Sequence, residues 1–254
     1  MPISLALIQG IITTSEKIGA PIRAELIAAI DRANSVHEKV YALTVGSSAL
    51  ATAVLAALDN KSNPIADRAV QQVITANAIS DGIQRQVTDL AAAAVVDTLR
   101  DNVDALLESW QEPFNTAAEQ IRTAAKTLGA VTLDDTAGIL RRGGDAAEQW
   151  RIASTANLVI DEIDGMFARL AATTGFASLS RHYLVLRIAD PTLEQWEGNS
   201  LTERKLSAWD AHRLGLPLSL ADRITLPLRI AKLAADREQR TITAMENEAG
   251  KRRR

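Results

Sequence analysis

The chain contains no cysteine among its 254 residues. This absence excludes disulfide bonds, thiolate nucleophiles and zinc–thiolate sites. Aromatic residues make up only 4% of the chain, whereas 47% of it is hydrophobic, and alanine supplies much of that share. Alanine is the best helix former but fills a core poorly. The composition therefore favours long helices packed along extended seams, and a structural or interaction role over a catalytic one.

Motifs that would identify a reaction or a cofactor are also missing. Gly143-Gly144 is not part of a phosphate-binding loop, and no Gly-x-Gly-x-x-Gly run occurs. Neither Gly-x-Ser-x-Gly nor His-Glu-x-x-His is present. The three histidines, His37, His182 and His212, are far apart in the sequence and none has metal-ligand spacing to another. We therefore expect no enzymatic activity, no cofactor and no metal.

Two long stretches, residues 21–59 and 64–110, can each be interpreted as one amphipathic helix. Only four residues separate them, and Asn63 followed by Pro64 is typical of a helix start. Long helices joined by so short a turn pack antiparallel. In the first stretch, alternating spacings of four and three give a seam of Ile22, Leu26, Ala29, Ala33, Val36, Val40, Leu43, Ser47, Leu50, Val54 and Ala57. The stripe of the second stretch is Val96, Leu99, Val103, Leu106 and Trp110.

The rest of the chain predicts more helices of unequal length. A break is expected at residues 111–113, then helices over 114–128, 132–142 and 145–173, with glycines after each. Shorter segments follow, and residues 183–188 are the one plausible strand. The sequence thus predicts an all-α protein, an elongated antiparallel bundle of long alanine-rich helices with a smaller helical C-terminal region. Its expected parts are a long-helix bundle (1–175), a compact helical region or arm (176–226) and a C-terminal helix with a basic tail (227–254).

Charge is unevenly spread along the chain. The whole chain carries −3, yet from Arg223 onward nine basic residues stand against four acidic ones. The last four residues, Lys251, Arg252, Arg253 and Arg254, are all basic. Acidic residues line one face of the second long stretch, at Asp97, Asp101, Asp104 and Glu108. Both groups are candidate partner-binding residues, for a protein partner, a second copy or, through the tail, nucleic acid.

The carboxylates Asp161, Glu162 and Asp164 lie close together on the predicted helix over 145–173. Such a group can bind a divalent metal ion. A di-metal bundle would also need Glu-x-x-His motifs on facing helices, and none occurs. We therefore interpret these residues as a solvated acidic face.

Arg32-Ala33-Asn34-Ser35-Val36-His37 has the Arg-x4-His spacing of the HEPN ribonuclease family, which this segment resembles. The resemblance implies an all-helical nuclease in which Arg32 and His37 act on a scissile phosphate where two such helices meet in a dimer. Ala33 departs from the pattern, because that family usually has a polar residue there. The resemblance covers six residues and supplies the alternative to a non-enzymatic role.

Residues 40–58 contain no charged side chain over about the length of a membrane span. Their threonines, serines and alanines make them weakly apolar, so we expect a buried bundle helix, with a membrane-associated helix as the alternative. An acidic body with a basic terminal helix resembles the layout of phage scaffolding proteins, an analogy of architecture alone. The sequence therefore predicts a structural or assembly protein that acts by self-association and partner binding, of the virion, scaffolding or head/tail accessory kind. The expected location is cytoplasmic or virion-associated.

Overall fold

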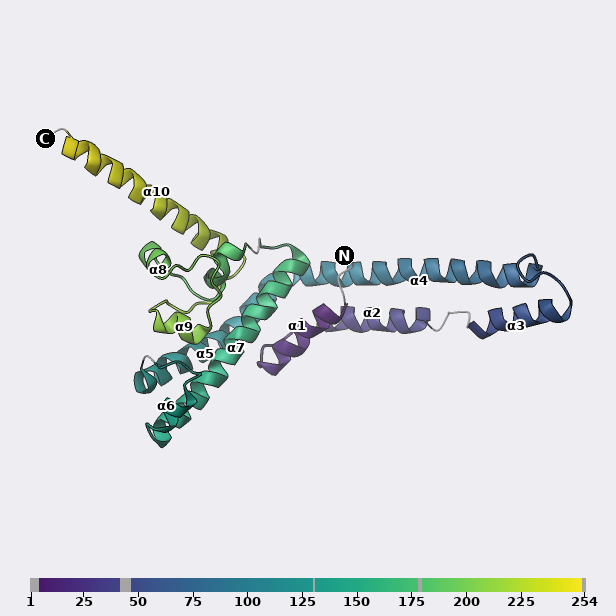
Figure 1. Ribbon diagram of the computed structural model, residues 1–254, viewed down its shortest axis with the longest axis horizontal. Helices are drawn as coiled ribbons and strands as arrows, with labels where there is room; N and C mark the ends of the chain where they lie inside the picture. The colour runs from purple at the N-terminus through teal and green to yellow at the C-terminus, as the bar shows by residue number, and fades with distance from the viewer. Residues whose placement is uncertain (1–4, 42–46, 130, 178–179, 253–254) are drawn as a thin grey trace. The chain divides into compact units, whose positions relative to one another are not determined.

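The structure is a computed structural model that describes residues 5–41, 47–129, 131–177 and 180–252. The described residues contain helices and no strand, and one isolated antiparallel bridge joins Ala189 to Leu218. The protein is all-α, as its composition predicts (Figure 1). In chain order the helices are α1 (Leu5–Lys17), α2 (Ala24–Tyr41), α3 (Ser47–Asp59), α4 (Arg68–Asp101), α5 (Val103–Leu128), α6 (Thr136–Leu140), α7 (Gly144–Thr174), the 3₁₀ helix η1 (Arg181–Arg187), α8 (Leu193–Gly198), α9 (Ala208–Arg213) and α10 (Thr225–Arg252).

The chain forms two units. Unit 1 comprises Arg23–Leu99 with a short N-terminal stretch that ends at Ala6, and unit 2 comprises Leu7–Ile22 and the chain from Arg100 onward. These units differ from the predicted parts 1–175, 176–226 and 227–254, and that division stays a prediction.

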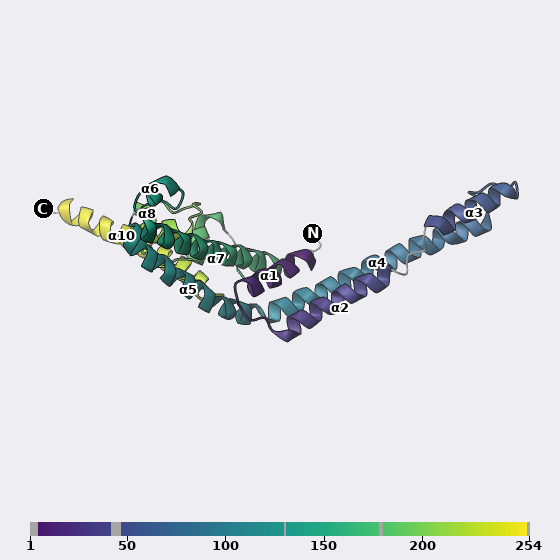
Figure 2. The ribbon, with the colours of Figure 1, turned by 90° about the horizontal axis from the view of Figure 1, so that it is seen from below.

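Unit 1 is a helical hairpin in which α2 and α3 lie alongside α4, as both views show (Figure 1, Figure 2). α4 has 34 residues, so at about 1.5 Å per residue it is roughly 50 Å long. Leu26, Ala33 and Ala57 of the predicted seam are buried, which confirms that this face of α2 and α3 packs against protein. On α4 the facing buried residues include Val70 and Val95.

The ends of these helices differ from the prediction. α2 begins at Ala24 rather than Pro21, and residues 42–46 lie outside the described residues, so an unbroken helix over 21–59 stays a prediction. α4 begins at Arg68 rather than Pro64, because Asp67 supplies the stronger cap. Its carboxylate accepts hydrogen bonds from the backbone N–H groups of Ala69 and Val70, at 2.9 and 3.4 Å, and from the Ser62 hydroxyl at 2.9 Å.

The predicted helix over 64–110 is interrupted at Asn102, whose φ of −104° and ψ of 8° are not helical. α5 then continues through Pro113, where a break was expected. A proline inside a helix costs about 3 kcal/mol. Trp110 and Phe114 on either side of Pro113 are both fully buried. Their packing offsets the missing backbone hydrogen bond, so the prediction of a break at 111–113 is wrong.

The core of unit 2 lies between α5 and α7, which pack antiparallel along much of their length (Figure 1). Near one end of the pair, Arg142 donates to the carbonyl of Leu128 at 2.8 Å. At the other end, Gly175 ends α7 with a left-handed φ of 71°, as the sequence predicts for a glycine at this position. The core side chains of the two helices include Trp110, Phe114, Ile121 and Leu128 of α5 and Ile160, Ile163, Phe167 and Leu170 of α7.

Residues 183–188 do not form a strand: Arg181–Arg187 is the 3₁₀ helix η1. The conformation follows from burial of a charged residue within it. Arg187 is 7% exposed and pairs with Asp164 of α7, at 2.6 Å from Nε to Oδ1 and 2.8 Å from Nη2 to Oδ2. Arg229 of α10 donates to the carbonyl oxygens of Leu186 and Ala189, at 2.7 and 3.2 Å. These contacts satisfy two backbone oxygens and pair a buried charge.

Candidate functional site

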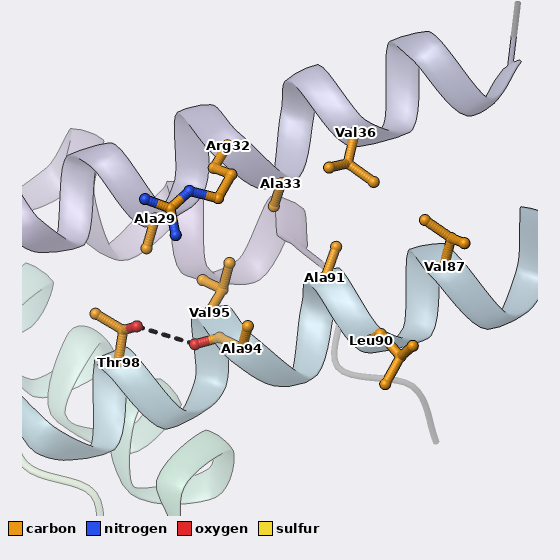
Figure 3. Close-up of a pocket in the computed structure, with 10 residues that line it drawn as sticks. All are labelled: Ala29, Arg32, Ala33, Val36, Val87, Leu90, Ala91, Ala94, Val95 and Thr98. Atoms are coloured by element: carbon orange, nitrogen blue, oxygen red, sulfur yellow. Dashed lines mark hydrogen bonds between the residues drawn. The ribbon is translucent and has the colours of Figure 1, made fainter.

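The candidate functional site is an apolar groove within unit 1, between α2 and α4 (Figure 3). Its volume is about 310 Å³. Ala33 of α2 and Ala91 of α4 point toward one another across it, and Val36 faces Val87 nearer one end (Figure 3). The lining residues are Ala29, Arg32, Ala33 and Val36 of α2, and Val87, Leu90, Ala91, Ala94, Val95 and Thr98 of α4.

The groove exists because its walls are built from small residues. Ala29, Ala33, Ala91 and Ala94 end at a methyl group, so neither helix supplies a side chain long enough to fill the space between them. Ala33 and Val95 are buried at its floor, whereas Leu90 at its rim is 71% exposed. A wall of this kind lets another helix approach closely and bury apolar surface.

The lining of the groove is mainly apolar. Its polar lining residues are Arg32 and Thr98, and the Thr98 hydroxyl donates to the carbonyl of Ala94 at 2.9 Å (Figure 3). No carboxylate, histidine or other base lines it together with Arg32. Arg32 extends along α2 beside Ala29 and supplies one positive charge at the rim (Figure 3).

The sequence located one wall of this groove and missed the other. The seam over 21–59 includes Ala29, Ala33 and Val36, which the structure places in the groove. The facing stripe was assigned only from Val96 onward. Val87, Ala91 and Ala94 recur at spacings of four and three, and that signal could have identified a second stripe on the predicted helix over 64–110, on a different face from Val96.

Arg32 and His37 both lie on α2, and both are exposed. Five residues apart on a helix of 3.6 residues per turn, they lie well over 90° apart around the axis. Arg32 lines the groove and His37 does not. The ribonuclease hypothesis stays a prediction.

The four acidic candidates do not belong to one element. Asp97 lies on α4 within unit 1, whereas Asp101, at the end of α4, and Asp104 and Glu108 of α5 belong to unit 2. All four are exposed. Asp104 lies 3.8 Å from Arg223, measured between Oδ2 and Nη1, so part of this face already contacts a basic residue just before α10. Binding of a basic partner here stays a prediction.

The basic tail lies largely outside the described residues. The side chains of Lys251 and Arg252, and the whole of Arg253 and Arg254, lie outside the described residues. Residues 42–46, within the possible membrane stretch over 40–58, also lie outside the described residues. Among the helices that are described, none combines the length and the apolar character needed to span a bilayer.

The carboxylates Asp161, Glu162 and Asp164 do not form one solvated face. Asp164 is buried against Arg187, so the interpretation is wrong for that residue. Burial raises the pKa of the half-buried Asp161, while Lys205 opposes the shift. Glu162 pairs with Lys17 of α1 at 2.5 Å. Within the described part of the chain, no cluster of acidic residues and histidines could hold a metal ion.

Comparison of the chain with protein-family models, with curated proteins and with solved structures finds no match.

Proposed function

We propose that the protein is a non-enzymatic helical assembly protein that acts by self-association and by binding partner proteins. The groove between α2 and α4 is the observation that carries this proposal. It is apolar, it is open at the rim around Leu90, and its small apolar side chains suit close packing of another helix.

The occupant that fits best is the same surface of a second copy. Two helical hairpins that face one another through alanine-rich seams form a four-helix bundle, in which each hairpin covers the apolar side chains that the other leaves exposed. Leu90 at 71% exposed and Ile83 at 52% exposed lie seven residues apart on α4. Such spacing keeps both on one face of a packed helix.

The experiment compares the mass of the full chain in solution for two matched variants. Leu90→Asp places a charge at the rim of the groove, and Leu158→Asp places one on α7, where the leucine is 62% exposed and outside the groove. We expect Leu90→Asp to weaken self-association and Leu158→Asp to leave it unchanged, with both variants folded by circular dichroism. Equal association in the two variants would contradict a role for the groove.

Within this class we favour a virion, scaffolding or head/tail accessory component, in the cytoplasm or in a virion. The support is the analogy of layout: a chain of net charge −3 whose C-terminal part is basic. On this proposal the tail residues 251–254 bind an acidic protein surface, or nucleic acid. Association of the purified chain with an acidic partner at low salt, lost when the tail is deleted, would support it.

A further inference from the structure

The outer half of α10 is exposed on all sides. Every residue from Ala234 to Glu248 is exposed. Nearer its start the helix has one packed face, where Leu226, Arg229 and Leu233 are buried. On the same side, Arg237 and Arg240 contact Glu197 of α8, at 3.2 and 2.5 Å.

The opposite side of α10 carries a stripe that is apolar except for Glu238. Its members recur at spacings of three and four, and they are Leu228, Ala231, Ala235, Glu238, Ile242 and Met245. Leu228 is 61% exposed, Ile242 is 43% exposed and Met245 is 65% exposed. Packing on unit 2 does not explain this stripe, because it lies on the face turned away from Leu233 and Arg237. Such a repeat is typical of the seam of a coiled coil.

We propose that this stripe pairs, antiparallel, with the same stripe on α10 of a second copy. The inference rests on the proposed assembly function and names a second surface for it. The pairing sets Leu228 opposite Met245 of the second copy, Ala231 opposite Ile242 and Ala235 opposite Glu238. Each alanine then faces a longer side chain, so the seam has no run of facing alanines.

Charge selects this orientation. Lys232 follows Ala231 and Glu246 follows Met245, so both lie along the same edge of the stripe. When two copies pair antiparallel, Lys232 of each lies along the same edge of the seam as Glu246 of the other, offset by about five residues or roughly 7.5 Å along the axis. Both side chains are long enough to span this offset, which gives two ion pairs flanking the seam. Lys232 is more than half exposed, although its Nζ also lies 3.9 Å from Asp190.

A parallel pair would bring like charges together and would pack less well. Every stripe residue would face its own copy, so two Glu238 carboxylates would meet within the seam, and alanine would face alanine twice. A single polar residue in such a seam sets the register at a cost in stability. In the antiparallel pair Glu238 has that role, since it faces the small side chain of Ala235.

Charge exchange on the full chain tests the proposal. We expect Lys232→Glu alone, and Glu246→Lys alone, each to raise the dissociation constant of the dimer by about tenfold, because both symmetric pairs become repulsive. The double variant Lys232→Glu/Glu246→Lys restores opposite charges and should recover most of the affinity. These residues are exposed, so folding is retained, which circular dichroism checks. A double variant that associates no better than the single ones would overturn the proposal.

Thiol cross-linking gives an independent readout of orientation, because the chain has no cysteine of its own. A mixture of the variants Ala235→Cys and Glu238→Cys should form a mixed disulfide far more than either variant alone. Efficient cross-linking of Ala235→Cys with itself would mean a parallel pair and would overturn the proposal.

The same measurements separate this inference from the proposed function. If the chain associates, loses association in Leu90→Asp and is indifferent to the Lys232 and Glu246 exchanges, the groove function stands and the α10 pairing is wrong. A chain that stays monomeric at every concentration contradicts both.

Discussion

Arg187 of η1 and Asp164 of α7 form a buried ion pair, in which each side chain is only 8% exposed. Two contacts, of 2.6 and 2.8 Å, join the guanidinium to the carboxylate. The pair links a segment that is not α-helical to the central helix of unit 2. It also explains why residues 181–187 stay in place without a neighbouring strand.

Removal of one partner of this pair should destabilise unit 2 strongly. We expect Asp164→Ala to lower the free energy of unfolding by about 3–5 kcal/mol, because Arg187 is left charged in a buried position. Arg187→Met/Asp164→Leu should cost much less than Asp164→Ala, since both charges are then absent. Chemical denaturation of the three proteins measures the difference. A double variant less stable than Asp164→Ala would contradict this reading of the pair.

His212 of α9 predicts a pH dependence of stability. Partial burial lowers the pKa of His212 below its ordinary value of 6.5, and the Arg122 charge adds to the shift. The unfolded chain therefore takes up the proton more readily, and this contribution to stability is present above pH 6.5 and is lost as the pH falls below it. We expect His212→Gln to flatten the fall in melting temperature between pH 7 and pH 5. An unchanged pH profile would mean that His212 is solvated as in the unfolded chain.

The ribonuclease alternative makes a separate prediction. Since Arg32 and His37 lie on different faces of α2, we expect purified protein not to cleave RNA. We also expect Arg32→Ala and His37→Ala to behave as the wild type in a cleavage assay. Cleavage by the wild type that is lost in both variants would favour the nuclease and reject the assembly proposal.

Deletion of the tail residues 251–254 should leave folding intact, because little core depends on a chain end. It removes four positive charges. We expect the truncated chain to bind an acidic partner more weakly, with the difference shrinking at high salt as the charges are screened. Binding that is the same for both chains at every salt concentration would show that the tail has no such role.

The sequence predicted the class of fold well because the apolar spacing of long helices is a strong signal. The predicted stripe of five residues from Val96 to Trp110 shows what that signal can and cannot predict. All five stripe residues are buried. Yet the helix breaks at Asn102 within the stripe. A break of one residue leaves the spacing of three and four unchanged on both sides, so the pattern could not show it.

Other predictions were wrong because contacts between residues far apart in the sequence decide the local structure. Pro113 reads as a helix end, and only the burial of Trp110 and Phe114 overrides it. Residues 183–188 read as a strand, and only the ion pair between Arg187 and Asp164 and the hydrogen bonds from Arg229 explain η1. The sequence identified only one wall of the groove, through Ala29 and Ala33 of α2. The stripe on α10 carried the same spacing signal but was not assigned, because an apolar residue with no partner is indistinguishable in sequence from one that is packed.

The measurement that tests the central claim most directly is sedimentation of the wild-type chain over a wide range of concentration. The account predicts an average mass that exceeds the 27.3 kDa of one chain and rises with concentration. A mass of 27.3 kDa at every concentration would contradict self-association as the basis of its function.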